Sequence, residues 1–156
     1  MHALSKTGAM KTLDHYAVGD VETFGSYLLT REEVLDFASR FDPQPFHLDD
    51  DAAAQSPIFG RLSASGWHTA AATMRMMVDR NVETGTETMG SPGVEEIRWR
   101  TPAYPGDTLS LRREVLEARA SASRPELGFV KHRITTFNQS GETVMTMVAT
   151  TIVPTR

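Results

Sequence analysis

Residues 37–49 read Phe-Ala-Ser-Arg-Phe-Asp-Pro-Gln-Pro-Phe-His-Leu-Asp, and this stretch separates two differently patterned parts of the chain. Pro43 and Pro45 cannot continue a helix, because proline lacks the backbone donor and its ring clashes with the preceding turn. Any helix that runs into this stretch must therefore end close to Asp42. We call residues 42–47, where the helix must stop, the stop region. The segments on either side of it indicate the fold class.

The residues before the stop predict one strand and one helix. Residues 21–29 are rich in β-branched and aromatic side chains, which favours a strand. Thr30 to Glu33 match a capping box, whose reciprocal bonds satisfy free amides at a helix start, and the helix should reach about Arg40. Its apolar residues share one helical face: Val34, Phe37, Ala38 and Phe41. Regular structure is expected to begin near Val21, after a lead-in.

The residues after the stop predict two further helical segments. Asp49-Asp50-Asp51 reads as a solvated helix start, because acidic residues complement the helix dipole there. Ser65 can cap a longer helix that reaches roughly Arg80. One face of this helix contains Trp67, Ala70, Ala71, Met74 and Val78. Small side chains on that face would let a curved sheet approach closely, so we expect this helix to be central.

The last third of the chain predicts strands over residues 94–100, 107–117, 128–137 and 142–153. Turn residues separate them, and Asn138 to Gly141 should join the last two as an antiparallel hairpin. We expect the four strands to form a meander. The whole order of segments indicates an α+β fold with an antiparallel sheet packed on one principal helix. Residues 1–19 are interpreted as an N-terminal tail or lead-in and residues 20–156 as a single domain.

The composition argues against several classes of function. A length of 156 residues suits one domain, and the net charge of −4 argues against nucleic acid as a partner. The absence of cysteine excludes disulfides, thiolate nucleophiles and cysteine-based metal sites. No apolar run is long enough to span a membrane or to serve as a signal peptide, so a cytoplasmic protein without membrane contact is expected.

Charge is unevenly distributed along the chain. Residues 1–90 contain 7 basic against 13 acidic side chains, whereas residues 91–156 contain 9 against 7. A phosphate-bearing ligand is therefore expected to meet the C-terminal part. The candidate contacts are Arg98, Arg100, Arg124, Lys131 and Arg133. Alternation on solvent-facing strands explains these five residues equally well.

The stop region resembles the signature Asp-x-Asn-Pro-apolar-His of MaoC-like dehydratases and (R)-specific enoyl-CoA hydratases. Asp42, Pro45, Phe46 and His47 match it in type and spacing, while Gln44 stands in place of the Asn. The resemblance covers most of residues 20–154. It implies a hot-dog fold, in which an antiparallel sheet wraps around a long central helix, with an extra short helix before the catalytic loop. The order of segments agrees with that fold.

The resemblance also implies a reaction. A hydro-lyase of this family adds water to, or removes it from, the 2,3 double bond of an enoyl thioester and gives an (R)-3-hydroxyacyl thioester. Hydration needs one group that takes a proton from water and one that delivers a proton to the α-carbon, and a carboxylate and an imidazole suit these tasks. By family analogy, Asp42 and His47 hold the water. Coenzyme A is expected as part of the acyl-CoA substrate, with no further cofactor.

The start of the long helix offers a second candidate feature. An amide at a helix N-terminus can stabilise negative charge on the thioester oxygen, and Gly66 would let that carbonyl approach. Ser65 falls where the family commonly has His, and it is interpreted as a helix cap, with His68 as a possible replacement. Residues that the resemblance places at the substrate are Ser65, Trp67, His68, Ala71 and Met74.

Two alternative functions and two further expectations complete the prediction. No metal is expected, because the acidic run at Asp49 lacks the ligand spacing of a metal site. A hot-dog thioesterase has less support, since Met74 to Met77 offer no acidic residue on the long helix. A non-catalytic acyl-CoA binding protein would agree with the departures at Gln44 and Ser65. A homodimer or dimer-based oligomer is expected, because a single hot dog leaves a sheet edge and a helix face to cover.

Overall fold

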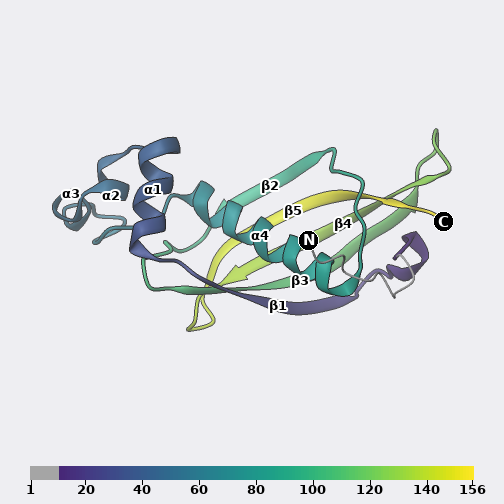
Figure 1. The fold of residues 1–156 in the computed structure, drawn as a ribbon, viewed down its shortest axis with the longest axis horizontal. Coiled ribbons are helices and arrows are strands. Elements are labelled where there is room, and N and C mark those ends of the chain that lie inside the picture. Colours follow the sequence, from purple (N-terminus) through teal and green to yellow (C-terminus); the bar gives the residue numbers. More distant parts are fainter. Residues whose placement is uncertain (1–10) are drawn as a thin grey trace, which may run out of the picture.

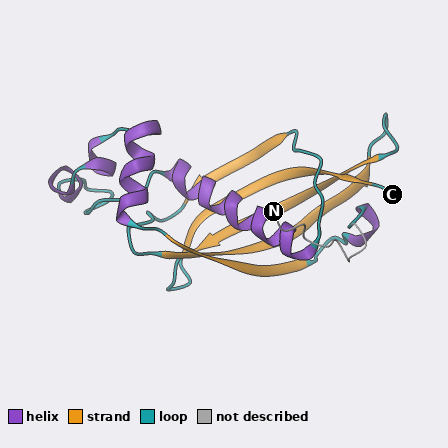
Figure 2. Ribbon diagram, viewed as in Figure 1, coloured by secondary structure: helices purple, strands orange, loops and turns teal. Residues whose placement is uncertain are grey.

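The computed structural model describes residues 11–156 and consists of a five-stranded sheet, a long helix and a group of short helices (Figure 1). In chain order the elements are a 3-10 helix (Leu13–His15), β1 (Val21–Leu28), α1 (Arg31–Phe41), α2 (Pro45–Leu48), α3 (Asp50–Ala54), α4 (Gly66–Thr84), β2 (Gly93–Trp99), β3 (Thr108–Ala120), β4 (Leu127–Phe137) and β5 (Thr143–Pro154). Helix α4 lies along one face of the curved sheet, and α1 to α3 gather beyond one end of it (Figure 2). The predicted α+β architecture is confirmed.

The strands are antiparallel throughout, in the order β1-β3-β4-β5-β2. Strands β3, β4 and β5 form the expected meander, but the prediction that β2 belongs to it is wrong, because β2 pairs with β5 at the far edge. The segment between β2 and β3 is too long for a tight hairpin turn and contains Pro102 and Pro105. It carries the chain to the opposite side of the sheet, where the Gly106 N–H bonds to the carbonyl of Leu29 at 2.7 Å.

Helix α4 buries a different face from the one predicted. Its buried residues are His68, Thr69, Ala72, Thr73, Met76 and Met77. The predicted inner face is exposed instead, with Trp67 at 59%, Met74 at 52% and Val78 at 46%. The prediction is wrong because threonine can be buried when its hydroxyl is satisfied: Thr73 Oγ1 lies 2.8 Å from Thr136 Oγ1 in the core. Apolar residues occur on both faces, so periodicity alone could not choose between them.

Two local expectations also need correction. Regular structure begins before Val21, because Leu13 of the 3-10 helix packs against the cluster formed by Val115, Val130 and Val153. Residues 1–10 of the predicted lead-in lie outside the described residues. At the start of α1, Thr30 accepts the Glu33 N–H at 3.2 Å. The reciprocal half of the capping box is absent, because the Glu33 carboxylate binds the Tyr27 hydroxyl instead.

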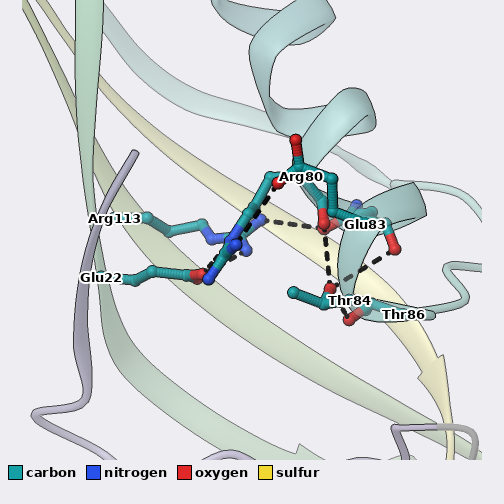
Figure 3. Close-up of polar contacts among 7 residues, drawn as sticks. Glu22, Arg80, Glu83, Thr84, Thr86 and Arg113 are labelled. Carbon is teal, nitrogen blue, oxygen red and sulfur yellow. Dashed lines mark hydrogen bonds and ion pairs between the residues drawn. The ribbon is translucent and has the colours of Figure 1, made fainter. Parts of the chain in front are cut away.

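An ion cluster connects the C-terminal part of α4 to the sheet. Figure 3 shows Glu22 of β1 between Arg80 of α4 and Arg113 of β3. Glu22 Oε1 lies 2.5 Å from Arg80 Nε, and Oε2 lies 3.0 Å from Arg113 Nη2. Burial raises the pKa of Glu22, but the hydrogen bonds from both arginines outweigh burial and hold it below its ordinary value. The carboxylate therefore stabilises the folded chain above the ordinary glutamate pKa, and this contribution is lost as pH falls through the lowered value.

Glu22→Gln is expected to lower the free energy of unfolding by about 1–2 kcal/mol at pH 7, because Arg113 and Arg80 both lose this carboxylate, although Arg80 keeps its pair with Glu83. Urea titrations at pH 7 and at about pH 3 measure the effect, and the difference from wild type should shrink at the lower pH. Glu126→Gln is the control, because its pair with Arg124 is exposed on both sides. Equal losses in the two variants would contradict the role of the cluster.

Candidate active site

The stop region folds into a compact corner between α1 and α2. Helix α1 ends at Phe41, and the N–H of Asp42 still bonds to the carbonyl of Ala38 at 2.9 Å. The N–H of Gln44 then bonds to the carbonyl of Asp42 at 2.7 Å, and Pro45 begins α2, where a missing N–H costs nothing. This corner brings the side chains of Asp42 and His47 together, with Oδ2 of the first 3.4 Å from Nε2 of the second.

The Asp42 carboxylate is mostly buried, with 16% of its side chain exposed, and both of its oxygens accept hydrogen bonds. Ser65 Oγ donates to Oδ2 at 2.7 Å, and Gln44 Nε2 donates to Oδ1 at 2.6 Å. Burial raises the pKa of Asp42, but the bonds from Ser65 and Gln44 and the nearby His47 ring together bring it below its ordinary value. Asp42 is therefore ionised at neutral pH.

His47 is buried and held by one backbone contact. Its Nδ1 lies 2.7 Å from the carbonyl oxygen of Ser63, which can only accept a hydrogen bond, so Nδ1 carries a proton. In the neutral ring, Nε2 is then an acceptor. Nε2 of His47 and Oδ2 of Asp42 thus face each other as two acceptors, and a water molecule has the two O–H donors that would satisfy both.

Gly66 begins α4, so its N–H has no acceptor within the helix. A Cβ at this position would lie 2.5 Å from Cε2 of Trp99, far closer than real Cβ contacts. Trp99 Nε1 also donates to the Gly66 carbonyl at 2.8 Å. From the sequence, Gly66 was expected to leave room for a substrate carbonyl. In the structure, the indole ring of Trp99 occupies the space that a side chain at residue 66 would need.

One cavity of about 420 Å³ is lined by Asp42, His47 and Gly66 together. Its volume lies within the range typical of small-molecule sites. Most of the remaining wall is apolar: Ile58, Phe59, Trp67, Trp99, Pro102 and Ala103. The site therefore combines a reactive polar pair and an open helix amide with a surface suited to an acyl group.

Comparisons with known proteins show the family of this chain. Residues 17–137 match the protein family described as the MaoC like domain. The chain belongs to the MaoC-like family. A MaoC-like dehydratase from Rhodospirillum rubrum is 38% identical, with a TM-score of 0.81 over 94% of this chain and 98% of that one. The predicted hot-dog fold and family are thereby confirmed.

Two further proteins are similar to this MaoC-like chain. The uncharacterized protein YdeM of Bacillus subtilis (strain 168) is 28% identical over 127 residues, which cover 81% of this chain and 87% of YdeM. The (R)-hydratase from A. caviae involved in PHA biosynthesis is 24% identical, with a TM-score of 0.64 over 89% of this chain and 98% of that one. At this identity the second likeness shows the fold alone.

Ser65 has more than one partner in this MaoC-like site. Its buried hydroxyl accepts the N–H of Trp67 at 3.3 Å, as a helix cap does, and also donates to Asp42. The cap interpretation is therefore correct but incomplete. Trp67 lines the cavity from its rim and meets Trp99 edge-on, with ring centroids 5.1 Å apart.

The structure does not bring His68, Ala71 and Met74 to the cavity of Asp42 and His47, because none of the three lines it. His68 and Ala71 line a hollow between α1 and α4, where the His68 ring stacks on Phe37 at 4.8 Å. His68 Nδ1 has no hydrogen-bond partner in the described part of the chain, and burial lowers the pKa of this ring. The helical period explains this difference: Gly66 and Thr69 line the cavity, whereas residues 68 and 71 face the hollow between α1 and α4.

Several contributing residues were missed from the sequence. Gln44 was noticed as a departure from the MaoC-like signature but not as a partner of Asp42. Ser63 acts through its backbone carbonyl, which any residue possesses, so no sequence signal could identify it. Trp99 reaches Gly66 only because β2 lies at the far edge of the sheet, which the predicted meander did not allow.

Residues 11–156 contain neither a metal-binding cluster nor a helix suited to a membrane. No group of three or more His, Asp or Glu side chains in this range could hold a metal ion. In the acidic run, Asp49 caps α3 by accepting the Ala52 N–H at 2.9 Å, and Asp50 pairs with Arg31. None of the helices in the same range is both long enough and apolar enough to cross a membrane.

Proposed function

We propose that this MaoC-like protein is a hydro-lyase that adds water to, or removes it from, the 2,3 double bond of an enoyl thioester. The product of hydration would be an (R)-3-hydroxyacyl thioester, with the acyl group held by coenzyme A. The observation that carries the proposal is the pair of facing acceptors, Asp42 Oδ2 and His47 Nε2, 3.4 Å apart in a cavity that also presents the Gly66 amide.

In the proposed reaction, the bound water donates one hydrogen bond to Asp42 and one to His47. As the water oxygen bonds to C3, its proton passes to His47 Nε2, the C2=C3 electron pair forms a C1=C2 bond, and the carbonyl electron pair moves to the thioester oxygen. The Asp42 carboxylate stabilises the imidazolium, while the Gly66 N–H stabilises the enolate oxygen. His47 then returns the proton to C2, so water supplies both the hydroxyl group and the hydrogen.

The direct test follows the loss of enoyl-thioester absorbance with crotonyl-CoA and longer analogues, while a thiol reagent detects free coenzyme A. Loss of absorbance without thiol release is the expected result. Thiol release without hydration would replace the proposal with a thioesterase. Binding without either change across the whole panel would instead favour a non-catalytic acyl-CoA binding protein.

The predicted homodimer forms part of the same proposal. Helix α4 exposes a row of apolar side chains, Trp67, Met74, Val78 and Val82, and the edge strand β2 also exposes Val94. Apolar patches of this kind and unpaired strand edges favour association with a second copy. Light scattering coupled to size exclusion measures the mass in solution, and a mass of one chain would exclude the dimer.

Ser65→Ala is expected to raise the pKa of Asp42 and to lower kcat/KM by about tenfold or more, because a hydrogen bond to the charged carboxylate is lost. Carbon-13 NMR titration of the Asp42 carboxyl, assigned by its disappearance in Asp42→Asn, measures the pKa directly. Ser63→Ala is the matched control, because it removes a hydroxyl near His47 and keeps the backbone carbonyl. An unchanged Asp42 pKa in Ser65→Ala would show that Ser65 is only a helix cap.

A further inference from the structure

Arg100 is the only lysine or arginine that lines the catalytic cavity in the described part of the chain. It directly follows β2, and its N–H donates to the carbonyl of Val144 at 2.9 Å, which fixes its backbone to β5. Arg100 also lines a neighbouring hollow of about 230 Å³ that contains Arg133 and Val148. Arg100 therefore lies where the cavity meets a second concave surface.

The neighbouring hollow lies on the face of the sheet away from α4. Arg133 of β4 and Val148 of β5 are paired across the strands, and the next pair along, Ile134 and Met147, belongs to the core beneath α4. Successive residues of a strand point to opposite faces, so Arg133 and Val148 point outward. A ligand that leaves the cavity past Arg100 would thus pass onto a surface with a second guanidinium.

Within residues 11–156 the side chain of Arg100 forms no ion pair, side-chain hydrogen bond or ring contact, and its charge acts on Glu96 only from a distance. The four other candidates for phosphate contact differ from it, because each pairs with a carboxylate: Arg98 with Glu96, Arg124 with Glu126, Lys131 with Glu95 and Glu117, and Arg133 with Glu114. Of the five, Arg100 alone combines a free guanidinium with a position at the cavity.

The charge of Arg100 acts at the rim of the cavity and not on the reacting pair. Against the effect of burial, hydrogen bonds from Ser65 and Gln44 and the nearby His47 ring lower the pKa of Asp42, with no contribution from Arg100. The pKa of Glu96 is lowered chiefly by Arg98, and Arg100 and Arg133 add to that effect. A free cation at the rim of a mostly apolar cavity favours a ligand whose reacting part is apolar and whose distant part is anionic.

We propose that Arg100 binds a phosphate group of the thiol carrier, so that the carrier arm leaves the cavity past this residue. The proposal rests on the proposed function, because it concerns the same thioester substrate. A guanidinium suits phosphate, since its planar donors can bind two oxygens at once. The phosphate that ends the pantetheine arm is shared by coenzyme A and by phosphopantetheine carriers, and coenzyme A has further phosphates beyond it.

The experiment compares three crotonyl thioesters, those of pantetheine, 4′-phosphopantetheine and coenzyme A, with wild type, Arg100→Gln and Arg98→Gln. Arg100→Gln is expected to raise KM about tenfold or more for phosphate-bearing substrates and to leave kcat and the pantetheine thioester unchanged, because only binding away from the reacting atoms is lost. Arg98→Gln is the control, since Arg98 lies two residues before Arg100, within β2, but pairs with Glu96.

The three substrates also locate the phosphate. An effect on both phosphate-bearing thioesters supports contact with the phosphate at the end of the pantetheine arm, and an effect on the coenzyme A thioester alone supports contact with its nucleotide phosphates. Equal effects on all three thioesters, or no effect on any, would overturn the proposal. If wild type hydrates none of them, the proposed function fails, and calorimetric binding of coenzyme A then tests Arg100 separately. Equal affinity of wild type and Arg100→Gln overturns the role of Arg100, and weaker binding by the variant supports it.

Discussion

Asp42→Asn is expected to lower kcat/KM for enoyl-thioester hydration on the order of 10³-fold. The amide keeps the size of the side chain but has no charge with which to stabilise the imidazolium of His47. It also presents either an N–H₂ or a neutral oxygen to Ser65, so the bond from the Ser65 hydroxyl is lost or weakened. The initial rate of loss of crotonyl-CoA absorbance measures the effect.

A matched control separates this effect from a general change of charge. Asp51→Asn removes the same charge from an exposed position in α3 and is expected to leave turnover within about twofold of wild type, because surface charges beyond close contact are screened. Urea titration of both variants checks that they fold. Turnover of Asp42→Asn close to that of wild type would remove Asp42 from the mechanism.

Gly66→Ala should reduce kcat by about a hundredfold, because the added Cβ would meet the Trp99 ring at 2.5 Å and one of the two must move. Movement of the backbone displaces the N–H proposed to stabilise the enolate oxygen. Movement of the ring breaks the hydrogen bond from Trp99 Nε1 to the Gly66 carbonyl and changes the cavity wall. Single-turnover rates with saturating crotonyl-CoA measure the effect on chemistry.

The double variant Gly66→Ala with Trp99→Ala tests the physical cause. If the clash with the indole is responsible, removing the ring should restore part of the lost rate, so that Gly66→Ala costs less in the Trp99→Ala background than in wild type. Equal costs in the two backgrounds would show that the indole is not the reason for glycine. Wild-type turnover in Gly66→Ala itself would exclude the proposed role of this amide.

The bounds of most strands were predicted closely because they depend on local chemistry, but α4 continues to Thr84 instead of ending near Arg80, and the short helix α2 was not predicted. Pro43 ends α1 within one residue of the expected position, and Ser65 caps α4 as proposed. The pairing of β2 with β5 is a different matter, since strand order is decided by contacts between residues distant in sequence. The inner face of α4 was mistaken for a related reason: Thr73 is suited to the core only because Thr136 meets it there.

The candidate site shows the same division between local and distant causes. Asp42 and His47 were found because their spacing follows from one short corner of the backbone. The link between Ser65 and Asp42 spans 23 positions and could not be read from spacing. Trp99 was missed because its place beside Gly66 depends on the strand order.

The hydroxyl of Ser65 imposes two independent requirements on one position. The first turn of α4 requires an oxygen that accepts the Trp67 amide, and the Asp42 carboxylate requires a group that donates. Aspartate meets the first requirement and not the second, and alanine meets neither. A substitution at residue 65 must therefore preserve both the start of α4 and the hydrogen bond to Asp42, and few residue types can do both.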